Sequence, residues 1–260
     1  MILRRFSESL QQQNWAAIAI EFLLLVLGVF LGIQVANWNA ERETNQKAVV
    51  FTERLKADLR EEAWGYQYLI EYNRDVLANA NTAVDALSDR TTASNKTLLV
   101  SAYRATQYKQ RTRRRATYDE LISTGTIGLI KDQVLRDTTM RIYNVATIDN
   151  LVREGAESGF RRAFRMRIPN DVQRALSKDC GDRTIDIGDF AGIADNLDYP
   201  CKLDLPQQQI DEAADALRAD AGLVPLLRLR IADIGTRLHD MTVNNRDILR
   251  GLEAVAGDAP

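Results

Sequence analysis

The stretch that decides the fold runs from Trp15 to Val35 and reads WAAIAIEFLLLVLGVFLGIQV. Among its 21 residues only Glu21 and Gln34 are plainly polar. A helix of this length rises by roughly 31 Å, which matches the thickness of the hydrocarbon core of a bilayer. The run is longer than the apolar core of a cleaved signal peptide, and no small-x-small cleavage site follows it cleanly. Residues 15–35 therefore predict an uncleaved transmembrane helix.

The basic residues that flank this segment leave its orientation nearly balanced. Arg4 and Arg5 precede it, and Arg42 and Lys47 follow it, whereas orientation depends on which side carries more nearby lysine and arginine. A short arginine-bearing head before a single apolar run is typical of a signal anchor. We therefore expect residues 1–14 to form a cytoplasmic head, with the bulk of the chain exported to the periplasmic side of a bacterial inner membrane.

The two cysteines support export. Cys180 and Cys201 enclose the Gly- and Asp-rich segment GDRTIDIGDFAGIADNLDYP, which has little helical pattern. A disulfide closing a loop of about 20 residues would contribute on the order of 3 kcal/mol and would persist in an oxidising compartment. The sequence thus predicts a Cys180–Cys201 disulfide, and two buried free thiols in a cytosolic domain are the alternative.

One face of the predicted membrane helix collects its polar and small residues. Asn14, Glu21, Gly28 and Val35 are spaced by seven, and Gly32 follows Gly28 by four, so all lie on one stripe. Gly-x-x-x-Gly allows a second helix to approach closely, and a carboxyl group in lipid is costly unless it is neutral or paired. We expect Glu21, Gly28 and Gly32 to contact another protein helix. Alternatively, the glycines are incidental and Glu21 reaches water near the head groups.

Beyond the span the sequence predicts an all-α fold. The chain of 260 residues contains 14 Gly and 5 Pro, too few for a turn-rich β-sandwich. Helix formers and apolar spacings of three and four continue through Asn39–Leu87, so we expect the membrane helix to continue into a long stalk helix. Further helices are expected over 94–110 and 225–252. Packed antiparallel on the stalk, they would form a helical-bundle domain over residues 36–260.

Apolar stripes define the expected core. On the stalk the stripe comprises Phe51, Leu55, Leu59, Tyr66, Leu69, Asn73, Val76, Ala80, Val84 and Leu87. Gly125 can end a short helix and Asp132 can begin a third long one, whose stripe would be Leu135, Thr138, Ile142, Val145 and Val152. The last helix has an uninterrupted seam of Leu227, Ile231, Ile234, Leu238, Met241, Asn245, Ile248 and Leu252. Asn73 and Asn245 occupy core-like positions, where asparagine more often fixes register than binds a ligand.

Two stretches, IEFLLLVLGVFLGIQVANWNAERE and TYDELISTGTIGLIKDQVLRDTTMRIYN, share a recognisable pattern. An acidic residue opens the span, a Gln-x-x-Asn-Trp-Asn run closes it, and a Tyr-x-Glu-Leu helix reaches a Ser/Thr-Gly turn. The residues are Glu21, then Gln34, Asn37, Trp38 and Asn39, and then Tyr118, Glu120, Leu121, Ser123 and Gly125. This pattern resembles an uncharacterised bacterial family of single-pass membrane proteins, a domain of unknown function. The resemblance covers under half of the chain and implies an anchored helical protein, with no activity attached.

The sequence carries no recognisable catalytic motif: it has no G-x-x-x-x-G-K-[ST], H-E-x-x-H, C-x-x-C or G-x-S-x-G. With His239 as its one histidine, it has little from which to build a metal centre or a Ser-His-Asp relay. Glu61 and Glu62, like Asp119 and Glu120, are helical neighbours that point about 100° apart, and we assign them to solvated faces. We expect no enzymatic activity, cofactor or metal.

Two basic clusters are candidates for binding an anion. The first is Lys109, Arg111, Arg113, Arg114 and Arg115, and the second is Arg161, Arg162, Arg165 and Arg167. If the two approach each other, they would hold a phosphate, a carboxylate or an acidic protein surface. The alternative is a solvated surface paired with the abundant acids, since 36 Asp+Glu accompany 34 Lys+Arg. Nucleic acid is not an expected partner, because the net charge is -2 and export removes the chain from DNA.

Together these patterns predict a non-enzymatic, membrane-anchored structural or accessory protein. It would form a homo-oligomer or join a larger membrane complex through the Glu21, Gly28 and Gly32 face and the stalk. The alternative is a periplasmic module that senses an anionic ligand and signals through a partner protein.

Overall fold

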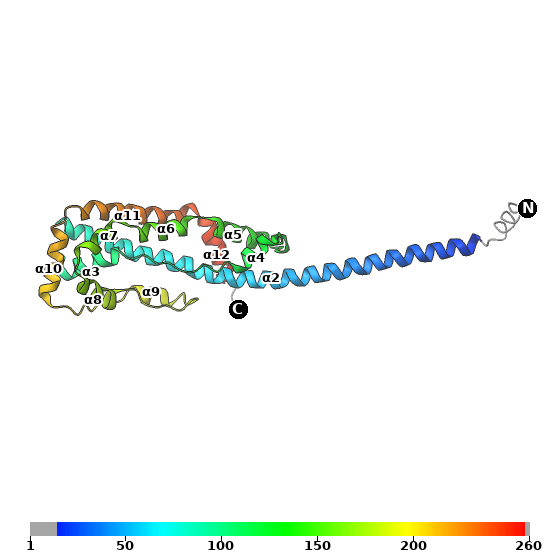
Figure 1. The fold of residues 1–260 in the computed structure, drawn as a ribbon, viewed down its shortest axis with the longest axis horizontal. Helices are drawn as coiled ribbons and strands as arrows, with labels where there is room; N and C mark the ends of the chain where they lie inside the picture. Colours follow the sequence, from blue (N-terminus) through cyan, green and yellow to red (C-terminus); the bar gives the residue numbers. More distant parts are fainter. Residues whose placement is uncertain (1–14, 258–260) are drawn as a thin grey trace, which may run out of the picture. The chain divides into compact units, whose positions relative to one another are not determined.

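A computed structural model describes residues 15–257, and within this range the chain is helical with no strand (Figure 1). The predicted all-α fold is therefore confirmed. Residues 1–14, predicted to be a cytoplasmic head, lie outside the described residues. The chain divides into two compact units, residues 1–52 and residues 53–260.

The described part of the first unit belongs to helix α2, which runs from Trp15 to Leu87. The large apolar side chains between Ile20 and Val35 are 45–68% exposed. An exposed apolar surface this long is unusual on a protein surrounded by water. Among the described helices, α2 is the one long and apolar enough to cross a membrane, as the sequence predicts.

In the second unit, the remaining length of α2 carries a buried stripe. Eight of the ten predicted stripe residues are buried, and Phe51 and Leu87 at its ends are half-buried. Trp64 and Tyr68, which lie one helical turn apart on α2, stack with their ring centroids 5.4 Å apart and enlarge the buried surface of this helix. The spacing of three and four places these side chains where other helices can cover them.

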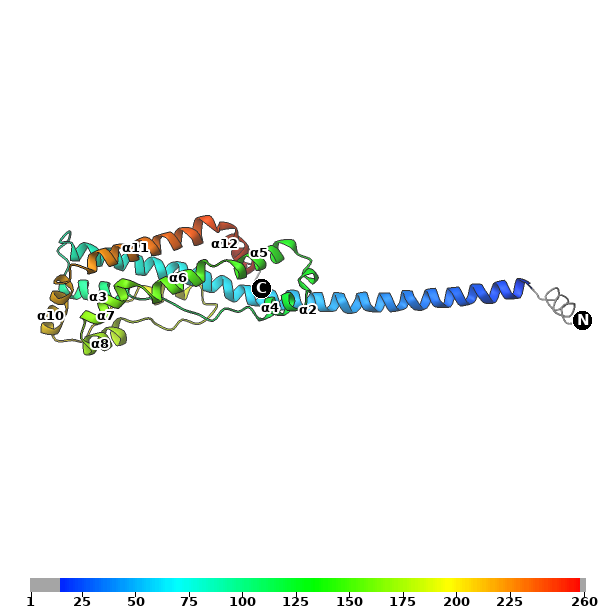
Figure 2. The same ribbon diagram turned by 45° about the horizontal axis from the view of Figure 1, so that its top comes forward.

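Ten further α-helices surround this length of α2 in the described chain. They are α3 (Asn95–Ala105), α4 (Ala116–Ser123), α5 (Gln133–Asn144), α6 (Thr147–Ala156), α7 (Gly159–Arg167), α8 (Asn170–Cys180), α9 (Gly192–Leu197), α10 (Gln207–Arg218), α11 (Leu223–His239) and α12 (Arg246–Gly257). Two short turns, η1 (Ile127–Leu129) and η2 (Asp240–Asn244), join α4 to α5 and α11 to α12. Helix α11 runs antiparallel beside α2 (Figures 1 and 2). Its Ile234 belongs to the same buried cluster as Trp64 and Tyr68.

The largest core lies between the end of α2 and helices α3, α7, α8, α10 and α11. Phe160 and Phe164 of α7 are its largest fully buried side chains. Ser94 starts α3 by accepting a hydrogen bond from the backbone N–H of Thr97 at 3.1 Å. The helix predicted over 94–110 ends at Ala105, and residues 107–115 form an irregular segment that is neither helix nor strand.

The predicted start signals of the third helix are confirmed, but its length is wrong. Asp132 accepts from the backbone N–H of Leu135 at 3.0 Å, and Gly125 has φ +68°. The helix stops at Asn144, and the Ile142 carbonyl, which would accept from the N–H of residue 146 in a continuing helix, accepts from Arg113 Nη2 at 2.8 Å. Val145 is extended, and α6 begins after it.

The last helix is also interrupted, contrary to the predicted seam. Residues Asp240–Asn244 form a π-turn between α11 and α12, and α12 turns away from the α11 axis (Figures 1 and 2). The backbone N–H and the side-chain amide of Asn245 both donate to the Asp240 carbonyl, five residues earlier. Met241 and Leu252 are nevertheless buried, so the break redirects the helix without exposing these seam residues.

Candidate functional site

The predicted contact face on the apolar segment of α2 is open in the described chain. Glu21, Gly28 and Gly32 are exposed, and a Cβ atom added at either glycine would meet nothing within 4 Å. Their spacing of seven and four places them on one side of α2. The face can therefore accept a second helix without any rearrangement of its own backbone.

The first basic cluster lies in the irregular segment 109–115, which we call the basic strap. Its anchor is Glu62, which is 1% exposed. Glu62 accepts hydrogen bonds from Arg111 Nη2 at 3.2 Å, Arg113 Nε at 3.1 Å and the backbone N–H of Arg114 at 2.9 Å. The prediction of a solvated face is therefore wrong for Glu62, because a buried carboxylate is tolerated when charged partners and donors surround it.

The rest of the basic strap pairs with nearer carboxylates. Arg114 Nε lies 2.6 Å from Glu61, and Arg115 Nε lies 3.0 Å from Asp119, both at exposed positions. Asp119 itself is exposed, as predicted. At the protein surface an ion pair gains little over the interactions that the same charges make with water, so these bridges hold the strap only weakly.

Two small features let the basic strap lie flat against α2. A Cβ at Gly65 would overlap the Arg111 guanidinium, so glycine makes room for this side chain. On the other side, Arg113 Nη2 donates to the Ile142 carbonyl at 2.8 Å, and its guanidinium lies over the Tyr143 ring. Arg113 therefore connects α2 to α5 through the strap.

The second basic cluster, in α7, is dispersed over separate partners. Arg161 donates to the Thr106 carbonyl at 2.8 Å and lies over the Tyr108 ring, just before the basic strap. Burial, and then the nearby charge of Arg165, lower the pKa of Arg161. Arg162 donates to the Glu157 carbonyl, and Arg167 pairs with Asp220 at 2.7 Å. Arg161 is thus the member of this cluster that contacts the segment leading into the strap.

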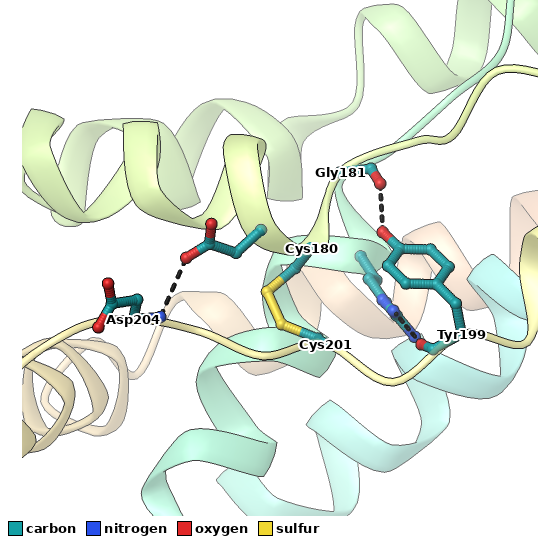
Figure 3. The surroundings of a disulfide bond; sticks show 7 residues. Cys180, Gly181, Tyr199, Cys201 and Asp204 are labelled. Atoms are coloured by element: carbon teal, nitrogen blue, oxygen red, sulfur yellow. Dashed lines mark hydrogen bonds between the residues drawn. A yellow bond between two sulfur atoms is a disulfide. The ribbon is translucent and has the colours of Figure 1, made fainter.

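The predicted disulfide is present and organises the loop between α8 and α10. Cys180 and Cys201 are bonded, with Cα atoms 4.9 Å apart (Figure 3). Beside the bond, the Tyr199 hydroxyl donates to the Gly181 carbonyl, and the backbone N–H of Asp204 donates to Asp179 (Figure 3). We call residues 181–200, which the bond closes, the disulfide loop.

The disulfide loop is tied to the stalk. The Tyr72 hydroxyl donates to both Asp182 oxygens, at 3.0 and 3.1 Å, and the Trp64 indole donates to the Asp189 carbonyl at 3.0 Å. Burial, and then the charge of Asp182, raise the pKa of Tyr72 well above its ordinary range. Tyr72 therefore stays a neutral hydrogen-bond donor, and its role here is structural.

A cleft of about 580 Å³ separates the basic strap from the disulfide loop. Trp64 and Tyr68 of α2 belong to its lining. Lys109 Nζ faces Asp182 across it at 3.5 Å. The sequence did not reveal this cleft, because its walls come from three separate segments, residues 61–68, 109–114 and 182–187.

Arg230 is a second buried charge that the sequence did not reveal. It is 2% exposed, its Nη2 donates to the Gln107 carbonyl at 3.0 Å, and its Nε has no hydrogen-bond partner in the described chain. Burial lowers its pKa to about 10. Within residues 15–257 no group of three His, Cys, Asp or Glu side chains is arranged to hold a metal ion.

Comparison with known proteins gives one match. The model of the Family of unknown function (DUF6090) matches residues 21–155, just over half of the chain. The match begins at Glu21, contains the basic strap and ends before the disulfide loop. No curated protein and no solved structure matches.

Proposed function

The chain belongs to DUF6090, a family of unknown function, and we propose that it is a non-enzymatic structural or accessory protein of the bacterial inner membrane. Residues 15–35 cross the bilayer, residues 36–260 lie in the periplasm, and the protein forms a homo-oligomer or joins a larger membrane complex. The observation that carries the proposal is the open face of α2 with Glu21, Gly28 and Gly32.

The chemistry of this face supports a protein contact over a purely lipid one. Lipid covers the leucine and phenylalanine side chains well, but it offers no hydrogen-bond partner to the Glu21 carboxyl group. Gly28 and Gly32 remove side-chain bulk beside it, so a second backbone can approach and bring donors to Glu21. A disulfide in the domain also supports the periplasmic side, because such bonds persist in oxidising compartments.

The proposal is tested by replacing Gly28 and Gly32 together with Ile in the full chain. The added side chains point into open space in the single chain, so they block close helix approach without straining the fold. We expect light scattering in detergent to give a smaller assembly for this variant. Ala19 lies on the opposite side of α2, so Ala19→Ile is the matched control and should keep the wild-type mass. An unchanged mass in the double variant contradicts association through this face, and a wild type that is already monomeric contradicts the homo-oligomer.

A second proposed function is that the domain senses an anionic ligand and signals through a partner protein. The observation that favours it is the cleft beside the basic strap, which has the size of a small-molecule site. Thermal unfolding of the full chain with anions tests it. Ligand-dependent stabilisation that alters the set of co-purifying proteins supports sensing, and stabilisation with an unaltered set contradicts it.

A further inference from the structure

The cleft between the basic strap and the disulfide loop carries more positive than negative charge. Its basic lining residues are Lys109, Arg111, Arg114 and Arg183, and its acidic ones are Glu61 and Asp182. Adding the pair directly behind the strap, Arg113 and Glu62, gives five cations against three carboxylates. A cleft with two unbalanced positive charges attracts an anion, and partly enclosed walls strengthen that attraction relative to open water.

Arg183 is the cation that is free to bind a ligand. Its guanidinium lies 3.7 Å from the centroid of the Tyr199 ring, which orients it but leaves its N–H groups available. In the described chain no carboxylate lies within ion-pair distance of Arg183, whereas Arg111 and Arg114 each have one. Arg183 is therefore placed to donate two parallel hydrogen bonds to an incoming oxyanion.

Lys109 is the second cation within reach of a ligand. Its Nζ lies 3.5 Å from Asp182, longer than an optimal charged hydrogen bond, while Asp182 is held by the Tyr72 hydroxyl. Lys109 can therefore turn toward a ligand without leaving Asp182 unbonded. Lys109 and Arg183 both line the cleft, and Lys109 pairs with the residue that precedes Arg183 in the sequence.

Most of the remaining lining is apolar, and its polar members are Thr112 and Thr184. Ile187 of the disulfide loop is 63% exposed, although it borders the cleft, and Ile185 is half-buried beside it. The stacked rings of Trp64 and Tyr68, each residue 4% exposed, also line the cleft. An exposed isoleucine in a cleft that an aromatic pair also lines favours a ligand with a flat apolar body over a sugar or a bare inorganic ion.

We infer that this cleft binds a small organic acid, with its carboxylate or phosphate group at Arg183 and Lys109 and its apolar body against Ile187 and the Trp64–Tyr68 pair. The cleft volume of about 580 Å³ lies within the usual range for such ligands. This inference rests on the second proposed function and is independent of association through the glycine face.

Calorimetry on the full chain in detergent tests this inference with three probes: 2-naphthoate, its uncharged counterpart 2-naphthamide, and inorganic phosphate. We expect 2-naphthoate to bind one site per chain. The other two probes should bind about tenfold more weakly or not at all, because 2-naphthamide lacks the negative charge and phosphate lacks the apolar body. Arg183→Gln and Lys109→Gln should each weaken 2-naphthoate binding about tenfold. Arg165→Gln, an exposed arginine outside the cleft, is the matched control and should leave it unchanged.

Three results would overturn the inference: no binding of 2-naphthoate, equal affinity for 2-naphthoate and 2-naphthamide, or unchanged affinity in both cleft variants. Co-purification from membranes with and without 2-naphthoate separates binding from sensing. Binding without any change in associated proteins removes the sensing proposal and leaves the site intact. The assembly mass of the Gly28→Ile, Gly32→Ile variant is read independently of both.

Discussion

Replacing Glu62 with Gln should destabilise the helical domain far more than the same change one residue earlier. Glu62 is fully buried and accepts three hydrogen bonds from the basic strap. The side chains of Arg111 and Arg113 are only 14% and 11% exposed. Glutamine keeps the shape but removes the charge, so two largely buried arginines lose their counter-ion, which costs about 3–5 kcal/mol.

Glu61→Gln is the matched control, because it removes a carboxylate of the same type from the same helix. Its partner Arg114 is 64% exposed, so the loss should stay below about 1 kcal/mol. For a domain of this size each kcal/mol lowers the melting temperature by roughly 2–4 °C. We expect a fall of about 10 °C for Glu62→Gln and at most a few degrees for Glu61→Gln, measured by circular dichroism. Equal melting temperatures for the two variants would refute the assignment of Glu62 as the anchor of the strap.

Three further predictions concern the same domain. Cys180→Ser with Cys201→Ser should reduce the free energy of unfolding by on the order of 3 kcal/mol in denaturant titration, and an unchanged value would show that the disulfide does not constrain the loop. Gly65→Ala should cost about 1–3 kcal/mol because the new methyl group displaces Arg111 from Glu62, whereas Gly128→Ala enters open space and should not. Burial raises the pKa of Tyr66 to about 12, so the folded state keeps a phenol proton that the unfolded state releases near pH 10. Its contribution is present below pH 10 and is lost as the pH rises toward 12; Tyr66→Phe should flatten this loss in alkaline unfolding, and an identical pH profile would contradict it.

Local patterns in the sequence were sufficient to predict α2 with its buried stripe, one helix end, one helix start and the disulfide. The apolar run and the spacing of three and four predicted α2 and its buried stripe, because a helix that is buried on one face has apolar residues at regular intervals in its sequence. Gly125 and Asp132 predicted a helix end and a helix start, since caps depend on residues within one turn. The disulfide followed from two cysteines that enclose a segment with little helical pattern.

The features that the sequence did not reveal depend on distant partners. Glu62 is buried by arginines that follow it by about 50 residues, and nothing in its own helix distinguishes it from Glu61. At the break after Asn144 the Ile142 carbonyl accepts from Arg113, which lies about 30 residues earlier in the chain. Gly65, a glycine in the middle of a helical pattern, is the local signal that could have indicated that another segment lies close to α2 at this point.

The cleft was missed for the same reason, since its walls meet only after the disulfide loop folds onto Trp64 and Tyr72. The sequence left open whether the strap approaches the arginines of α7 or forms a solvated surface. In the structure Arg161 is the arginine of α7 that contacts the residues before the strap, and Arg183, which no sequence pattern indicated, lines the cleft.

Protease accessibility of the C-terminal domain in spheroplasts is the most direct check on a membrane anchor that holds this domain in the periplasm. We predict that protease added to intact spheroplasts degrades residues 53–260 while a cytoplasmic marker protein survives. Protection of this domain until the spheroplasts are lysed would contradict the topology and the role built on it.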